Sequence, residues 1–171
     1  MIIMGVDPGL ANTGLGIINA EGQTLTAVHY DCIITESTAD FAERLLRIHE
    51  ALLRAIDAHQ PDACAMESIF FAKNAKSAFQ VGHGRGACIL TAAIRGVPVF
   101  EYTPLQIKKA LVGVGRAEKE QVQYMTRMLL GLKETPKPDH AADALAVAVC
   151  HANSMKFRAI TGNQAHIYGR H

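Results

Sequence analysis

The sequence has few of the features that would place a protein in a membrane or outside the cell. Apolar residues make up 49% of its 171 residues, yet no apolar run approaches the ~18 residues needed to span a bilayer. No basic segment precedes the apolar N-terminus, so we expect no signal peptide. The cysteines are far apart and form no CxxC pair: Cys32, Cys64, Cys88 and Cys150. We therefore expect buried thiols in a reducing cytoplasm, and neither a disulfide framework nor a zinc site.

Net charge is also nearly absent, at +1, but the charges are unevenly distributed. Residues 1–72 carry 3 Lys and Arg residues against 10 Asp and Glu residues, whereas residues 73–137 carry 11 against 4. A basic middle third is compatible with a polyanionic partner. A solvated helix surface explains the same composition, so charge alone does not decide between the two.

The order of apolar runs and chain breakers predicts an α/β domain. Strands are expected at residues 2–7, 13–19, 24–34, 63–67 and 97–102, and helices at 41–59, 75–95, 104–112, 117–130 and 140–153. Four residues are expected to precede their helices as N-caps: Asp40, Asn74, Thr103 and Asp139. This order predicts a mixed five-stranded sheet, three antiparallel strands and then two parallel ones, flanked by helices. Pro98 favours an edge position for the last strand. We expect one domain over residues 1–153 and a mobile C-terminal tail over residues 154–171.

The first predicted strand ends in an acid. Four apolar residues and Gly5 lead to Asp7, and Pro8-Gly9 then turns the chain. A buried carboxylate is costly unless it is paired or binds a metal. An Asp that merely initiates a turn before Pro-Gly is the alternative.

Other acids are expected to lie at the same place. The strand 63–67 also ends in an acid, Glu67, and a right-handed crossover through the first helix would place it parallel to the first strand. Open α/β sheets build their sites at such strand ends.

The last helix begins with His140 and Asp143 three residues apart, on one face of its first turn. The alanines around them have short side chains that would let this helix approach the sheet closely. Asp143 taken alone fits an exposed acid favoured by the helix dipole. Together with two strand-end acids, the pair predicts an oxygen-rich cluster suited to Mg²⁺. Two such ions in one site can promote phosphodiester hydrolysis.

Several spaced motifs then carry a family resemblance. They are Gly5-Val-Asp-Pro-Gly9 with Thr13-Gly14, Met66–Ala75, Gly84-Arg-Gly86, Val112–Lys119 and Ala141–Ala146. Over residues 1–153 the chain resembles the RuvC family of Holliday junction resolvases, within the RNase H-like superfamily. The resemblance implies a homodimer that nicks two opposed strands of a four-way DNA junction in recombination and repair. It also implies cooperation with the RuvA–RuvB branch-migration complex.

The resemblance assigns catalytic and metal-binding roles to Asp7, Glu67, His140 and Asp143. His140 stands where many members carry Asp, although some carry His. Two Mg²⁺ ions per site are implied, with Mn²⁺ as a substitute.

The resemblance also implies DNA contacts. Phe70 would be a wedge that stacks on an unpaired base at the crossover. Lys108 and Lys119 would lie beside the scissile phosphate, and Lys73 would be a further DNA-binding residue. Ordinary surface lysines and a core phenylalanine are the alternatives.

Two other functions are considered beside this one. Asp7-Pro-Gly9 also resembles the phosphate loop of actin-like ATPases, but 171 residues cannot supply their two domains. A non-cleaving RNase H-like protein that binds nucleic acid or assembles complexes would be expected to lack a site acid, and none is missing. Ala78, Gly82 and Gly86 are spaced as a groove for another helix, either within the chain or in a second subunit.

Overall fold

The computed structural model describes residues 1–68 and 75–161. For residues 75–77 and 157–161 it describes the backbone without the side chains. The strands are β1 (Ile2–Asp7), β2 (Asn12–Glu21), β3 (Thr24–Ile34), β4 (Ala63–Glu67) and β5 (Val99–Tyr102). They form one sheet in the order β3-β2-β1-β4-β5. β2 pairs antiparallel with β1 and β3, while β4 pairs parallel with β1 and β5. The predicted mixed sheet is confirmed, as is the edge position of the last strand. This strand begins at Val99, two residues after its expected start.

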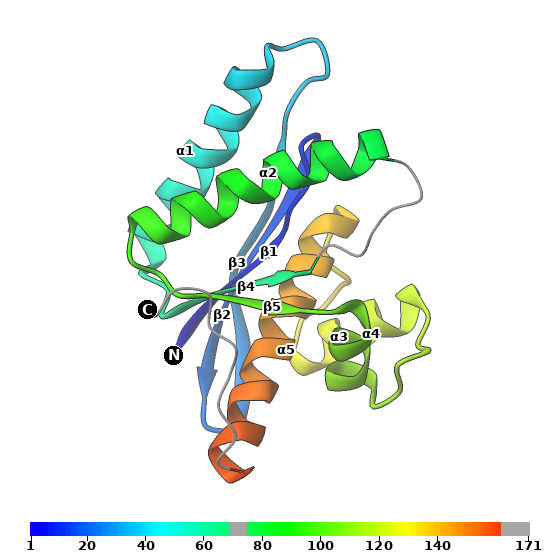
Figure 1. Ribbon diagram of the computed structural model, residues 1–171. Coiled ribbons are helices and arrows are strands. Elements are labelled where there is room, and N and C mark those ends of the chain that lie inside the picture. Colours follow the sequence, from blue (N-terminus) through cyan, green and yellow to red (C-terminus); the bar gives the residue numbers. More distant parts are fainter. Residues whose placement is uncertain (69–74, 162–171) are drawn as a thin grey trace.

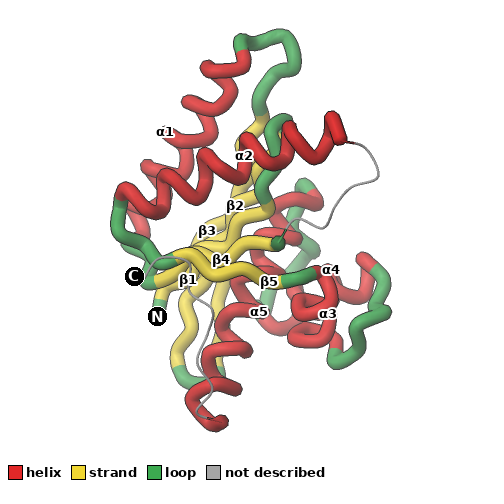
Figure 2. The backbone as a smooth tube through the Cα atoms, in the orientation of Figure 1, coloured by secondary structure: helices red, strands yellow, loops and turns green. Residues whose placement is uncertain are grey.

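Helices cover both faces of the sheet (Figure 1; Figure 2). They are α1 (Phe41–His59), α2 (Ala75–Ile94), α3 (Pro104–Val112), α4 (Lys119–Leu129) and α5 (Asp139–Thr161). α1 and α2 share one apolar core with one face of β1 and β2. α5 lies on the opposite face and, with α3 and α4, encloses the second core. Within the described residues, no helix is long and apolar enough to cross a membrane.

Local capping signals set the helix starts. The side chain of Asp40 accepts a hydrogen bond from the backbone of Ala42 and caps α1, as its sequence position predicts. Thr103 and Gln106 form a capping box at the start of α3, with Pro104 in the first turn. α4 starts at Lys119, two residues after its predicted start, because a reciprocal box between Glu118 and Gln121 fixes its first turn.

The end of the last helix was predicted wrongly. α5 continues to Thr161, beyond the expected end at residue 153. Apolar periodicity fades after Asn153, but no Pro or Gly interrupts the chain until Gly162. Asp139, expected to precede the helix as its cap, is its first residue. Residues 162–171 of the expected tail lie outside the described part of the chain.

α5 contacts the sheet backbone to backbone. A Cβ atom at Gly5 of β1 would overlap the carbonyl oxygen of Ala144, and one at Gly14 of β2 would overlap that of His140. Alanines complete the contact from the helix side and are almost fully buried: Ala141, Ala142, Ala144, Ala146 and Ala148. This close approach confirms the role expected for them, and it fixes the first turn of α5 over the end of β1.

Candidate metal centre and active site

Both strand-end acids point to the face covered by α5. Side chains alternate along a strand, and in β1 Ile3 belongs to the α5 core whereas Met4 and Val6 belong to the opposite core. Asp7 therefore falls on the Ile3 face. β4 repeats the pattern, with Ala63 and Ala65 in the α5 core, so Glu67 faces the same way. Because β1 and β4 are parallel neighbours, the two acids end adjacent strands, as predicted.

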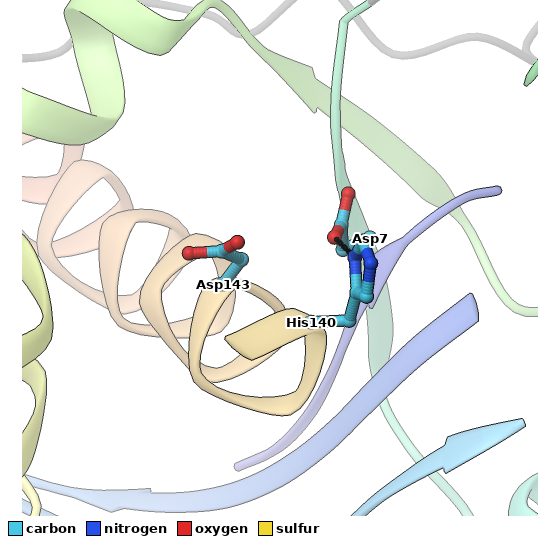
Figure 3. Close-up of side chains that lie close together, drawn as sticks. All are labelled: Asp7, His140 and Asp143. Carbon is cyan, nitrogen blue, oxygen red and sulfur yellow. Dashed lines mark hydrogen bonds and ion pairs between the residues drawn. The ribbon is translucent and has the colours of Figure 1, made fainter. Parts of the chain in front are cut away.

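Asp7 meets two side chains from the first turn of α5. Three potential ligand atoms, one each from Asp7, His140 and Asp143, lie within 4.8 Å of one another. Nδ1 of His140 lies 2.7 Å from Oδ2 of Asp7, and Figure 3 shows these two side chains in contact, with Asp143 further along α5. Two carboxylates and an imidazole, all partly exposed, suit a divalent cation that takes oxygen and nitrogen ligands. The donor set thus fits the metal site expected from sequence.

Glu67 stands beside this three-residue group and is not one of its members. Burial, together with the charges of Asp7 and Asp143, raises the pKa of Glu67 to about 7. The charges of Lys108 and Lys119 oppose the shift. Burial likewise raises the pKa of Asp143. The site therefore holds more negative charge than its surroundings stabilise, and a bound cation would relieve that repulsion.

Lys119 connects α4 to this site. Its Nζ lies 3.1 Å from Oδ2 of Asp143 and 3.1 Å from Oδ2 of Asp139. Burial lowers the pKa of Lys119, but the hydrogen bonds to Asp143 and Asp139 and the charges of these two acids together outweigh it, so the pKa is raised. Lys108 of α3 lines a cavity with Lys119, Glu67 and Asp143. Both lysines thus lie at the acidic site, and the contact with a scissile phosphate that the resemblance implies for them stays a prediction.

Asp139 is a residue of this site that sequence reasoning did not assign. It precedes Asp143 by four residues, so both acids share one face of α5. This spacing was a usable signal, but only the fold shows that a lysine of another helix lies between them. The predicted DNA-binding residues Phe70 and Lys73 fall outside the described residues.

A sheet of this order, with acids at the ends of β1 and β4 and a third on the helix across them, defines an RNase H-like nuclease. The profile of one family, the crossover junction endodeoxyribonuclease RuvC, matches residues 3–151. The chain belongs to the RuvC family of crossover junction endodeoxyribonucleases. Membership of an enzyme family, with all the expected acids present, favours catalysis over the non-cleaving alternative.

Individual relatives agree with this assignment. The chain is 50% identical to crossover junction endodeoxyribonuclease RuvC of Ruminiclostridium cellulolyticum over 95% of this chain and 98% of that protein. It is 51% identical to the enzyme of Alkaliphilus oremlandii over 92% and 96% of the two chains. Among solved structures, Thermus thermophilus RuvC in complex with Holliday junction substrate matches with a TM-score of 0.89 and 39% identity, covering 92% of this chain and 96% of that one.

The raised pKa of Glu67 predicts how the stability of the metal-free protein depends on pH. The folded protein holds the Glu67 proton up to about pH 7, whereas the ordinary pKa is 4.5. Between these values the folded state binds more protons than the unfolded state, so the free energy of unfolding falls as pH rises. One pKa unit corresponds to ~1.4 kcal/mol, and water screens the partly exposed carboxylate, so we expect a loss on the order of 2 kcal/mol.

Urea unfolding in EDTA at pH 5 and pH 8 measures this loss. Glu67→Gln should remove most of the difference between the two pH values, whereas Glu120→Gln, at an exposed position of α4, should leave it as in the wild type. An unchanged pH dependence in Glu67→Gln would contradict the assignment.

Proposed function

We propose that this chain cuts four-way DNA junctions as a metal-dependent endonuclease. The observation that carries the proposal is the convergence of Asp7, His140 and Asp143 within 4.8 Å, with Glu67 at the end of the neighbouring strand. For Thermus thermophilus RuvC, whose sequence and fold are close to those of this chain, a Holliday junction is the substrate in the solved complex. The relatives described above come from bacteria, so the proposed location is the cytoplasm, where bacterial DNA lies.

Asp7, Glu67, His140 and Asp143 would hold two Mg²⁺ ions, or Mn²⁺ in their place. When bound, such ions act as Lewis acids toward water and phosphate. The reaction adds water to phosphorus and breaks the bond to O3′, which leaves 5′-phosphate and 3′-hydroxyl ends.

The lysines of the site would bind the phosphodiester itself. Lys119 pairs with Asp143 and Asp139, and a phosphate entering the cavity would compete for the same ammonium group. Lys108 reaches the cavity from α3. Each lysine would offset negative charge that develops on the phosphate during cleavage. Base stacking by Phe70 and a DNA contact by Lys73 remain predictions.

A homodimer would form through the outer face of α2. No other atom lies within 4 Å of a Cβ atom built at Gly82 or Gly86, so these glycines do not pack within the described part of the chain. Phe79 and Leu90, on the same side of the helix, are 71% and 60% exposed. An exposed apolar stripe with glycines at its centre suits close contact with a second helix.

Symmetric pairing of this stripe would give a two-fold dimer with two active sites. Each subunit would then cut one of two opposed strands. Cooperation with the RuvA–RuvB complex is proposed from family membership alone.

Replacing one metal ligand should separate cleavage from binding. Asp7→Asn removes a charged ligand but leaves the basic surface in place, so we expect the single-turnover cleavage rate to fall by at least ~100-fold. Junction affinity in EDTA should stay within about threefold of the wild type. Asp31→Asn, at an exposed acid of β3, serves as the matched control and should cut normally. Wild-type cleavage rates in Asp7→Asn would refute the role of Asp7.

A charge in the stripe should prevent dimer formation. Leu90→Glu would bury an unpaired carboxylate in the contact, so we expect the dimer dissociation constant to rise by at least ~30-fold. Leu46→Glu on α1 is the control, because Leu46 is also exposed, at 53%. Sedimentation velocity compares the two variants. A stable dimer of Leu90→Glu would place the interface elsewhere.

A further inference from the structure

Arg85 of α2 is a nearly buried cation to which sequence reasoning gave no role. It is 9% exposed and lies within the Gly84-Arg85-Gly86 motif. Its Nη1 donates a hydrogen bond of 2.8 Å to the backbone carbonyl of Glu67. Its Nη2 donates to the carboxylate of Glu101 on β5. One guanidinium therefore joins a helix to the ends of two strands.

Stability alone gives a weak account of this arrangement. Burying a guanidinium costs several kcal/mol, and an apolar pair of similar volume is often as stable as a buried ion pair. What distinguishes the pair is its place, since one of the groups that Arg85 binds is the main chain of a residue assigned to the active site.

The sheet register explains how Arg85 reaches Glu67 from behind. Tyr102 lies opposite Glu67 in the β4–β5 ladder, and Glu101 lies opposite Met66. Phe100 and Tyr102 belong to the α5 core, so the side chain of Glu101, between them, faces α2. The carboxylate of Glu67 faces α5 and the metal ligands. Arg85 thus holds the backbone of Glu67 from one face of the sheet, while the Glu67 side chain extends from the other.

The same turn of α2 also lies against the chain that follows Asp7. A Cβ atom at Gly84 would come within 3.0 Å of the carbonyl of Gly9 and 3.1 Å of the nitrogen of Leu10. α2 is therefore held against the ends of both β1 and β4 at one level of the sheet. Arg85 is the residue of this turn that makes a directed polar contact.

We propose that Arg85, oriented by Glu101, is a positioning residue that fixes the backbone of Glu67 and thereby sets where its carboxylate meets the metal. Glu67 is the last residue of β4, and beyond it one backbone hydrogen bond, from the N–H of Ser68 to the carbonyl of Tyr102, continues the pairing with β5. Arg85 adds a second contact at this strand end, at the carbonyl of Glu67. Arginine suits the task because its planar donors engage two acceptors at once, which a lysine ammonium cannot do with the same geometry. The inference rests on the proposed metal-dependent cleavage.

Arg85→Lys tests this role while it keeps the positive charge. We expect a single-turnover rate about tenfold lower and a Mg²⁺ concentration for half-maximal rate several-fold higher, with junction affinity in EDTA unchanged. Glu101→Gln keeps an acceptor oxygen for Arg85, so its rate should stay within about threefold of the wild type. Arg95→Lys is the matched control, since Arg95 immediately follows the same helix and pairs with Asp57 at the surface; it should behave as the wild type.

A wild-type rate and Mg²⁺ dependence in Arg85→Lys would overturn the proposal. If that variant does not fold, Arg85→Met/Glu101→Met removes both charges and leaves none unpaired. The double variant should fold and still cut about tenfold more slowly; recovery of the full rate would show that only charge balance matters.

A second measurement separates this proposal from the proposed function. Mn²⁺ should raise the melting temperature of the wild type, and raise it less for Arg85→Lys, whether or not the protein cuts junctions. A wild type that gains stability from Mn²⁺ but cuts no junction would refute the function and leave the Arg85 test valid. Equal gains in the wild type and Arg85→Lys would refute the positioning role.

Discussion

The close contact between α5 and the sheet is the constraint on which the site depends. The backbone of α5 at Ala144 and His140 lies directly over Gly5 and Gly14, where a Cβ atom would overlap the helix backbone. Only at this separation do His140 and Asp143 come within reach of Asp7. His140 and Asp7 are 133 residues apart in the sequence. Small residues on both surfaces are thus as necessary to the proposed metal site as its candidate ligands, because they set the distance between the two elements that carry those ligands.

The two faces of the sheet contribute differently to this site. The α5 face supplies the side chains, and burial together with mutual repulsion raises the pKa of Glu67 to about 7. The α2 face supplies support, through Gly84 behind the turn after Asp7 and Arg85 behind Glu67. Since the outer side of α2 is also the proposed dimer contact, one helix would connect subunit pairing with the geometry of the acids. Such a connection suits an enzyme that must make two cuts in one junction.

Local signals in the sequence predicted most of the fold and much of the site. Apolar runs that end in an acid located Asp7 and Glu67, and a helix start with His140 and Asp143 three apart located the other two residues of the candidate site. Contacts between distant elements could not be predicted in this way. Asp139 belongs to the site only because Lys119 of α4 reaches it. Arg85 is placed behind Glu67 because the register of β4 and β5 turns the side chain of Glu101 toward α2. The length of α5 was predicted too short because the apolar periodicity fades after Asn153, although no Pro or Gly interrupts the helix before Gly162.

We infer that Asp7, His140 and Asp143 form a metal site in which His140 is a ligand. An imidazole suits Mn²⁺ better than Mg²⁺, which prefers oxygen. The most direct measurement is single-turnover junction cleavage by the wild type, His140→Asp and His140→Ala in each metal. We expect faster cleavage by the wild type with Mn²⁺ than with Mg²⁺, a smaller Mn²⁺ advantage in His140→Asp, and almost no cleavage by His140→Ala with either ion. Wild-type rates and metal preference in His140→Ala would contradict this inference.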